Sequence, residues 1–206
     1  MAATSATTVT DAILRVLEAI GRVSGDTACP SSAITSRLDA EYRRLRRRLA
    51  AEFPTIYEKT STSETLTTGV YLTRPTDCEI IRVLEKQSGN SWVPISVAPS
   101  LNRNEWGSIS FYVQGEKVYI VPTSVAPGTY RFHYTEEPAS GYTSMYLPAG
   151  LEDIVIEETA AWARVRHEED PAPHKMAARQ LWDDAYMGLW QAYGSHGRSG
   201  LNEALF

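Results

Sequence analysis

Cysteine is scarce in this sequence. The 206 residues include two cysteines, Cys29 beside a proline and Cys78 in a strand-like run. Small secreted proteins that depend on disulfides carry many more. The sequence therefore gives no disulfide framework, and two free thiols are the simpler interpretation.

Long apolar runs and an excess of basic charge are also missing. Charged residues interrupt every apolar stretch well before the roughly 18 residues that a membrane span needs. Residues 1–8 are small and polar, so we expect them to be mobile. They contain neither the basic region nor the continuous apolar region of a secretory signal, so we expect the protein to be made in the cytoplasm. The formal net charge of −5 argues against a protein that coats nucleic acid through general basicity, although it leaves room for a local basic patch.

Recognisable catalytic motifs are absent. The sequence has no Gly-x-Ser-x-Gly elbow, no Walker loop and no Gly-x-Gly-x-x-Gly turn, and its four histidines lack the spacing of a zinc site. Adjacent acids such as Glu157 and Glu158 point about 100° apart on a helix, so they do not act together on one substrate atom. We therefore predict no catalytic residue, no cofactor site and no metal site.

Apolar residues at helical spacing predict four helices. The first two run from Val9 to Val23, with a Thr8-x-x-Asp11 cap, and from about Ser31 to Phe53. The third begins after Pro148 and Gly150 at Leu151 and ends near Glu169, and the fourth follows Asp170-Pro-Ala-Pro173 with an apolar side of Met176, Leu181, Trp182, Tyr186, Leu189, Trp190 and Tyr193.

Between the helix pairs the pattern favours strands. We expect them at 79–86, 92–97, 109–114, 117–121 and 129–134, with Gly115-Glu116 as a two-residue hairpin turn. The predicted fold class is α+β: a four-helix body, two helices from each end of the chain, with a small antiparallel β-sheet or barrel inserted. The predicted domains are 1–54 and 145–195 for the body, 55–144 for the β insertion and 196–206 for a flexible C-terminal docking tail.

Charge is concentrated on the second and third helices. Five arginines in six positions predict either a solvated face paired with acids such as Glu41 and Glu52 or an interface to an acidic partner; they are Arg43, Arg44, Arg46, Arg47 and Arg48. Direct DNA binding is less favoured, because no base-reading or stacking residues accompany them. The third helix carries Glu152, Asp153, Glu157 and Glu158, and acids in a first turn suit the helix dipole.

Two apolar features lie outside the predicted elements. Trp106, in a loop, is either packed on its own sheet or offered to a tail-side or neighbouring subunit. Beyond the glycine-rich segment 195–200, Leu201, Leu205 and Phe206 indicate either a frayed end or a docking segment.

The order of motifs resembles the bacteriophage head–tail adaptor family, also called head-completion or connector proteins. The resemblance covers nearly the whole chain, and each motif alone is degenerate. It depends on Tyr71-Leu-Thr-Arg-Pro-Thr-Asp77, Ile80-Ile-Arg-Val83, Lys117-Val-Tyr-Ile-Val-Pro122, Arg131-Phe-His-Tyr-Thr-Glu-Glu-Pro138 and Tyr146-Leu-Pro148, between the two helix pairs. Leu72-Thr-Arg-Pro75 departs from the family's Tyr-x-Leu-Pro pattern by inserting residues before the proline.

The resemblance implies a non-enzymatic, dodecameric ring beneath the portal of the filled capsid, in the neck of the virion. Such a ring extends the DNA channel without sequence-specific binding and offers its far rim to stopper or tail proteins. It implies the C-terminal tail as the portal anchor, the arginines as a subunit interface, and the third-helix acids as channel lining or interface. An acidic balance suits a channel because carboxylates repel phosphate.

Two other classes of protein remain open. One is a tail-side ring protein, such as a tail terminator or tail-tube subunit, in which β structure would dominate; the large share of predicted helix counts against it. The other is an enzyme built of helices and a barrel, with a site that is assembled only in three dimensions.

Overall fold

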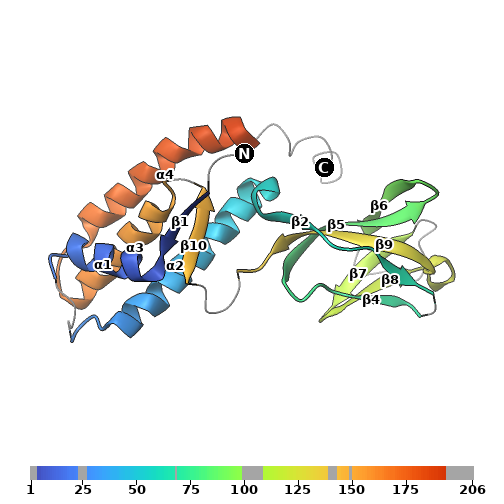
Figure 1. The fold of residues 1–206 in the computed structure, drawn as a ribbon, viewed down its shortest axis with the longest axis horizontal. Helices are drawn as coiled ribbons and strands as arrows, with labels where there is room; N and C mark the ends of the chain where they lie inside the picture. The colour runs from blue at the N-terminus through green and yellow to red at the C-terminus, as the bar shows by residue number, and fades with distance from the viewer. Residues whose placement is uncertain are drawn as a thin grey trace. The chain divides into compact units, whose positions relative to one another are not determined.

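The computed structural model describes residues 4–22, 27–67, 69–98, 109–138, 143–148 and 150–193. The chain divides into two compact units (Figure 1). The first, the helical unit, joins Met1–Ile56 to Ala139–Phe206, and the second, the β unit, is Tyr57–Pro138. The β unit is therefore an insertion that leaves the helical unit once and returns once.

All four predicted helices are confirmed as elements. They are α1 (Val9–Ala19), α2 (Ser31–Glu52), α3 (Glu152–Arg166) and α4 (Ala172–Tyr193). The predicted cap of α1 is present: the Thr8 hydroxyl oxygen accepts a hydrogen bond from the Asp11 backbone N–H at 3.1 Å. Such a bond satisfies one of the free donors of the first turn, which is why the helix begins there.

Helix α3 lies at the centre of the helical unit, because α1, α2 and α4 all contact it. Its buried side chains are not confined to one face; they are Ile154, Val155, Ile156, Thr159, Ala160, Ala161 and Ala163. The buried surface of α3 is thus broader than the single apolar face that its pattern predicts.

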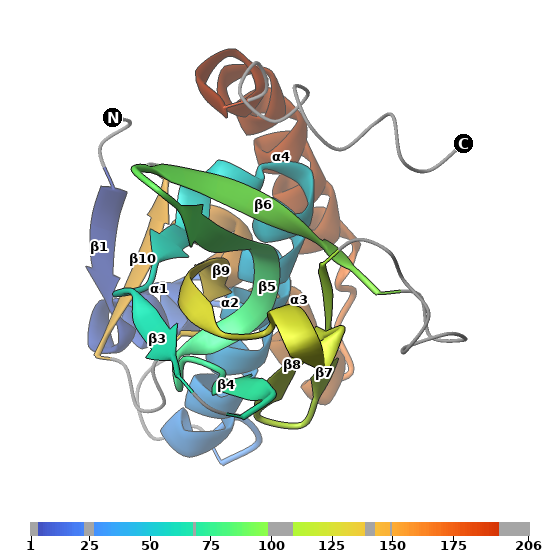
Figure 2. The same ribbon diagram turned by 90° about the vertical axis from the view of Figure 1, so that its right-hand side faces the viewer.

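The helical unit also contains a two-stranded antiparallel sheet. Strand β1 (Thr4–Thr8) pairs with β10 (Ser144–Pro148), from Thr4 opposite Pro148 to Thr8 opposite Ser144, and Figure 2 shows them side by side. The expectation that residues 1–8 are mobile is therefore wrong for residues 4–8, and residues 1–3 lie outside the described part. The two strands are far apart in sequence, so no local sequence pattern predicts that they pair.

The β unit is built on one sheet of eight strands. Its order is β2-β9-β5-β6-β7-β8-β4, and β3 also pairs with β9. The strands are β2 (Glu58–Thr60), β3 (Glu64–Leu66), β4 (Tyr71–Thr73), β5 (Cys78–Ser88), β6 (Ser91–Val97), β7 (Ser110–Gln114), β8 (Lys117–Val121) and β9 (Gly128–Glu136), with short 3-10 helices at Pro54–Tyr57 and Thr123–Val125. The five predicted strands correspond to β5 to β9.

The predicted fold class is nevertheless wrong. It placed a small antiparallel sheet or barrel in a four-helix body, whereas the sheet is large, mixed and curled into a half-barrel. Strands β2, β3 and β4 have three residues each, too few to show an alternating pattern, and they join the sheet only through tertiary pairing. Strands β6 and β7 are parallel; residues 98–109 connect them, and a parallel pair needs a connection of about a dozen residues.

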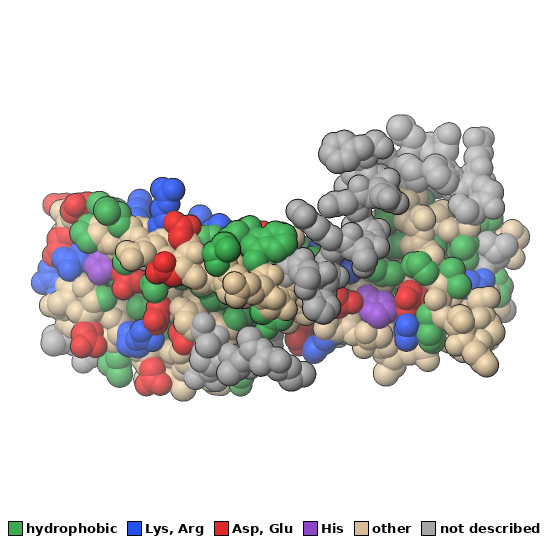
Figure 3. Space-filling view, turned by 90° about the horizontal axis from the view of Figure 1, so that it is seen from above, with side chains coloured by type: hydrophobic (Ala, Val, Ile, Leu, Met, Phe, Trp, Pro, Cys, Tyr) green, Lys and Arg blue, Asp and Glu red, His purple; other side chains and the backbone are tan. Residues whose placement is uncertain are grey.

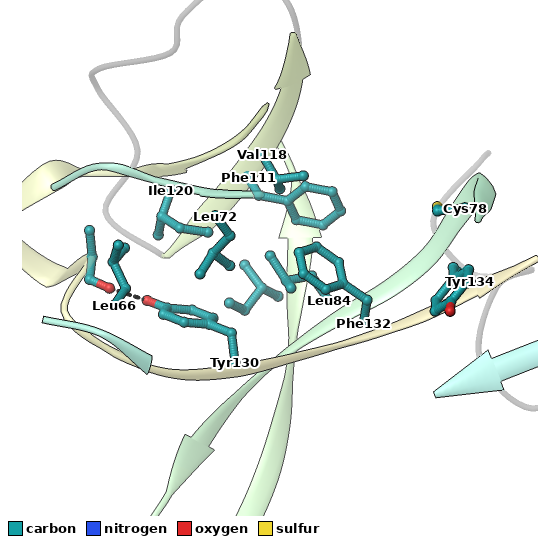
Figure 4. Packing of buried hydrophobic residues seen from close by; sticks show 12 residues of the cluster. Leu66, Leu72, Cys78, Leu84, Phe111, Val118, Ile120, Tyr130, Phe132 and Tyr134 are labelled. Atoms are coloured by element: carbon teal, nitrogen blue, oxygen red, sulfur yellow. Dashed lines mark hydrogen bonds between the residues drawn. The ribbon is translucent and has the colours of Figure 1, made fainter. Parts of the chain in front are cut away.

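The curl of the sheet encloses an apolar core. Irregular pairing of β5 with β9, between Cys78 and Ile80 and between Ile81 and Val83, bends the long central strands. The inward side chains of the described strands include Leu72, Leu84, Phe111, Val118, Ile120, Tyr130 and Phe132, shown in Figure 4. The buried Tyr130 hydroxyl donates a hydrogen bond to the Ala126 carbonyl, so its polar group is satisfied inside the core.

Candidate functional site

The predicted interface arginines are joined first to acids of their own helix. Arg43 Nε lies 3.0 Å from Asp39 Oδ2, and Arg48 Nε lies 3.0 Å from Glu52 Oε1. Both pairs are four residues apart, the spacing that brings side chains together on a helix surface. The Arg48–Glu52 pair agrees with the first of the two predictions for these arginines, a solvated face paired with acids such as Glu52.

Glu41 is the buried charge at the middle of α2. Its side chain is 6% exposed, and its carboxylate lies 2.5 Å from Arg37 Nη2 and 3.3 Å from Arg44 Nη1. A buried carboxylate needs such partners to offset its lost hydration. Arg44 therefore has a structural role in this chain, whatever else it contacts.

Arg46 and Arg47 have opposite exposures. Arg46 is 7% exposed, and its guanidinium carbon lies 5.9 Å from the centre of the Tyr42 ring. Arg47 lies on the exposed side of α2. The five arginines therefore do not form one uniform basic face: Arg46 is buried, whereas Arg44, Arg47 and Arg48 are exposed.

The α3 acids likewise have contacts within the helical unit. Asp153 Oδ1 lies 2.5 Å from Arg15 Nη2, and Glu157 Oε2 lies 2.7 Å from His174 Nδ1. Glu152 Oε2 is buried and lacks a hydrogen-bond partner among the described residues. Channel lining or an interface role for these residues stays a prediction, and in the structure Asp153 joins α3 to α1 and Glu157 joins it to α4.

Glu158 is brought together with the predicted interface arginines. A hollow of about 80 Å³ is lined by Arg44 and Arg48 of α2 and by Glu158 of α3, with Glu41, Leu45, Ile154 and Val155. Opposite charges thus meet on the surface of one helical unit. The predicted role of Glu158 in the channel lining or at an interface stays a prediction, and the structure shows it beside Arg44 and Arg48 of the same helical unit.

An aromatic groove between α2 and α4 escaped sequence reasoning. Its floor includes Trp182 and Tyr186, whose ring centres lie 5.8 Å apart, and Trp190, 6.4 Å from Tyr186. The Arg48 guanidinium carbon lies 3.5 Å from the centre of the Trp182 ring, a cation–π contact. The predicted apolar side of α4 is not wholly buried, because Met176 is 72% exposed.

The outer face of the β sheet carries a row of tyrosines. Tyr112 and Tyr119 are stacked at 5.0 Å with an angle of 8°, and Tyr71 lies 5.6 Å from Tyr119. Lys117 Nζ lies 4.2 Å from the centre of the Tyr71 ring. Because Tyr112 and Tyr119 stack on each other, the ring faces between them are not open to a nucleic-acid base. The row is therefore better suited to protein contact than to base stacking.

A second cluster on the same sheet joins β5 to β9. Glu85 Oε2 lies 2.5 Å from Arg131 Nε and 3.0 Å from His133 Nε2, and the Arg131 guanidinium carbon lies 4.3 Å from the centre of the Trp92 ring. Partial burial acts to raise the pKa of Glu85, but hydrogen bonds from Arg131 and His133 outweigh it and lower that pKa.

Metal-binding side chains are not clustered in the described residues. No set of three or more His, Cys, Asp or Glu side chains lies close enough to hold a metal ion in the described part of the chain. Both cysteine side chains are buried thiols. Among the residues described, no helix combines the length and the apolar character required to cross a bilayer.

Four predicted contact residues lie outside the described residues: Trp106 in the loop, and Leu201, Leu205 and Phe206 in the tail. Their roles stay predictions. Comparison with known proteins adds no assignment, since no protein-family model and no curated protein sequence matches this chain.

Proposed function

We propose that this protein is a structural adaptor of a bacteriophage neck, a ring-forming subunit that binds beneath the portal and links the capsid to the tail. The division of the chain into two compact units, each with a core of its own, is the observation that carries the proposal. An adaptor must hold two different bodies at once, which favours two folded units in one subunit.

The surfaces of the two units differ in the way this role requires. The helical unit offers charged helix faces and the aromatic groove, whereas the β unit offers the tyrosine row. A head-to-tail ring needs two unlike, complementary patches on each subunit, and unlike surfaces on two units provide candidates for them. The order of sequence motifs that resembles the adaptor family adds independent support.

The described contacts refine which residues serve the ring. The proposal keeps Arg43, Arg44, Arg46, Arg47 and Arg48 as the predicted subunit interface on α2, and Arg47 is the member tested because it lies on the exposed side of the helix. Two of the α3 acids, Asp153 and Glu157, have ion-pair partners within the chain. The proposal therefore assigns repulsion of the passing DNA to the net charge of −5 rather than to α3 alone.

A charge-reversal pair tests the ring. Purified protein is added to phage heads that carry a portal but were assembled without it, and electron microscopy scores a ring at the portal vertex. We expect the native chain to add a ring and the Arg47→Glu variant to fail. Arg179→Glu is the matched control, because Arg179 is 86% exposed on α4 and its carboxylate contact, Asp183, is at 3.9 Å.

The outcomes separate the ring from misfolding. Circular dichroism should be the same for the native chain and for both variants, because neither side chain is buried. If the Arg47→Glu variant forms rings normally, the proposed interface on α2 is wrong. If the native chain adds no ring to the heads, the adaptor proposal itself is wrong.

The eight-stranded sheet favours a second candidate, a tail-side ring protein such as a tail terminator or tail-tube subunit. The large share of helix still counts against this class, but the sheet is larger than the small one that the sequence predicted. Presenting the protein to isolated tails and to portal-bearing heads distinguishes the two, since each candidate predicts binding to a different body.

A further inference from the structure

The aromatic groove of the helical unit is large enough to hold several side chains. Its volume is about 520 Å³, and it lies beside the C-terminal half of α4. Its lining residues are Arg48 and Glu52 of α2 and Trp182, Asp183, Tyr186, Met187 and Trp190 of α4. Figure 3 shows hydrophobic side chains gathered toward the C-terminal end of α4, with charged side chains around them.

The floor of this groove is fixed by buried contacts. Phe53 is 1% exposed, and its ring centre lies 5.8 Å from that of Tyr186 and 5.9 Å from that of Trp190. At the rim Met187 is 64% exposed. A rigid aromatic floor with an adaptable methionine at its edge is suited to apolar side chains of an incoming segment.

The sequence that follows α4 has the matching chemistry. Helix α4 ends at Tyr193, and residues 194–200 read Gly-Ser-His-Gly-Arg-Ser-Gly. The last six residues, Leu-Asn-Glu-Ala-Leu-Phe, include three large apolar side chains. Leu201 and Leu205 are four positions apart, the spacing that lets two side chains share one side of a helical turn.

The connection is also of the right length. A chain of seven residues with this glycine- and serine-rich composition has a root-mean-square span of about 15 Å. Met187 lies six residues before Tyr193, about 9 Å back along the helix axis, and Trp182 lies about 16 Å back. The groove is therefore within the mean reach of the segment.

We propose that the groove beside α4 binds the C-terminal segment Leu201–Phe206 of the same chain, with Leu201, Leu205 and Phe206 as its apolar anchors. A short tether gives an effective concentration of about a millimolar, so even a weak intrinsic affinity fills the groove. A segment held there is withheld from any other partner, and release of the segment becomes a step in binding that partner. This inference stands apart from the ring proposal.

Methionine methyl NMR tests the contact directly. The sequence contains four methionines, and two of them, Met176 and Met187, are exposed on α4. The full chain, labelled with ¹³C at the methionine methyls, is compared with a chain that ends at Gly200 and with the full chain carrying Leu205→Asp. We expect the Met187 resonance to shift in both altered proteins and the Met176 resonance, eleven positions away in the same helix, to stay in place.

Assignment and mixing make the result specific. Replacing Met187 by Leu identifies its resonance. An identical Met187 resonance in the full and shortened chains would overturn the proposal. So would a shift of the Met187 resonance when the labelled, shortened chain is mixed with unlabelled full chain, because the segment would then bind a second copy. None of these readouts uses a phage head, so a failed ring assay and a failed groove assay are separate results.

Discussion

Loss of one leucine at the centre of the curled sheet should loosen the β unit and leave the helical unit intact. Leu84 is fully buried and lies opposite Ile95 on one side and Phe132 on the other. Leu84→Ala removes the packing to both neighbours and leaves a cavity, at a cost of about 2–5 kcal/mol in unfolding free energy. At about 3 kcal/mol the open population rises about 100-fold.

Hydrogen exchange followed by mass spectrometry measures this population segment by segment. In Leu84→Ala we expect amides of β5 and β9 to exchange about 100-fold faster, while those of α2 and α3 keep their native rates. Leu49→Ala is the matched control, because Leu49 is equally buried on α2 in the other unit. In this variant we expect the amides of α2 and α3 to exchange faster and those of β5 and β9 to keep their native rates. Equal acceleration of exchange in both units by either variant would refute the reasoning that each unit is held by its own core.

Three further predictions concern single interactions. Tyr130→Phe leaves the buried Ala126 carbonyl without its donor, so denaturant unfolding should show a loss of about 1–3 kcal/mol; an unchanged midpoint would contradict the hydrogen bond. Because the folded state lowers the pKa of Glu85, this carboxylate contributes stability above its unfolded pKa, and the contribution is lost as pH falls through the folded value. The stability gap between the native chain and Glu85→Gln should therefore be present at pH 7 and shrink below about pH 4, and a gap independent of pH would count against it. Thr8→Ala removes the cap of α1 and should cost about 1 kcal/mol, whereas Thr8→Ser should not; equal stability of the two variants would dismiss the cap.

The candidate site was only partly accessible from the sequence. The arginine run and the α3 acids are visible as charge patterns, and the Arg48–Glu52 pair follows from helical spacing. Burial of Arg46 and Glu41, and the shared hollow of Glu158 with Arg44, depend on which helix packs against which. Trp182 and Tyr186 show the same limit, because an aromatic residue at helical spacing fits a core and a groove floor equally well.

The sequence by itself determined the four helices and the strands β5 to β9. Their causes act over a few residues: apolar spacing along α2, the Thr8 hydroxyl at the start of α1, and Gly115 at a positive φ in the turn between β7 and β8. Tertiary structure alone decided that Thr4–Thr8 forms a strand, that the three-residue strands β2 to β4 join the sheet, and that β6 and β7 run parallel. Each of these depends on a partner distant in sequence, and the free energy that selects the partner comes from hydrogen bonds and burial that exist only once the chain has folded.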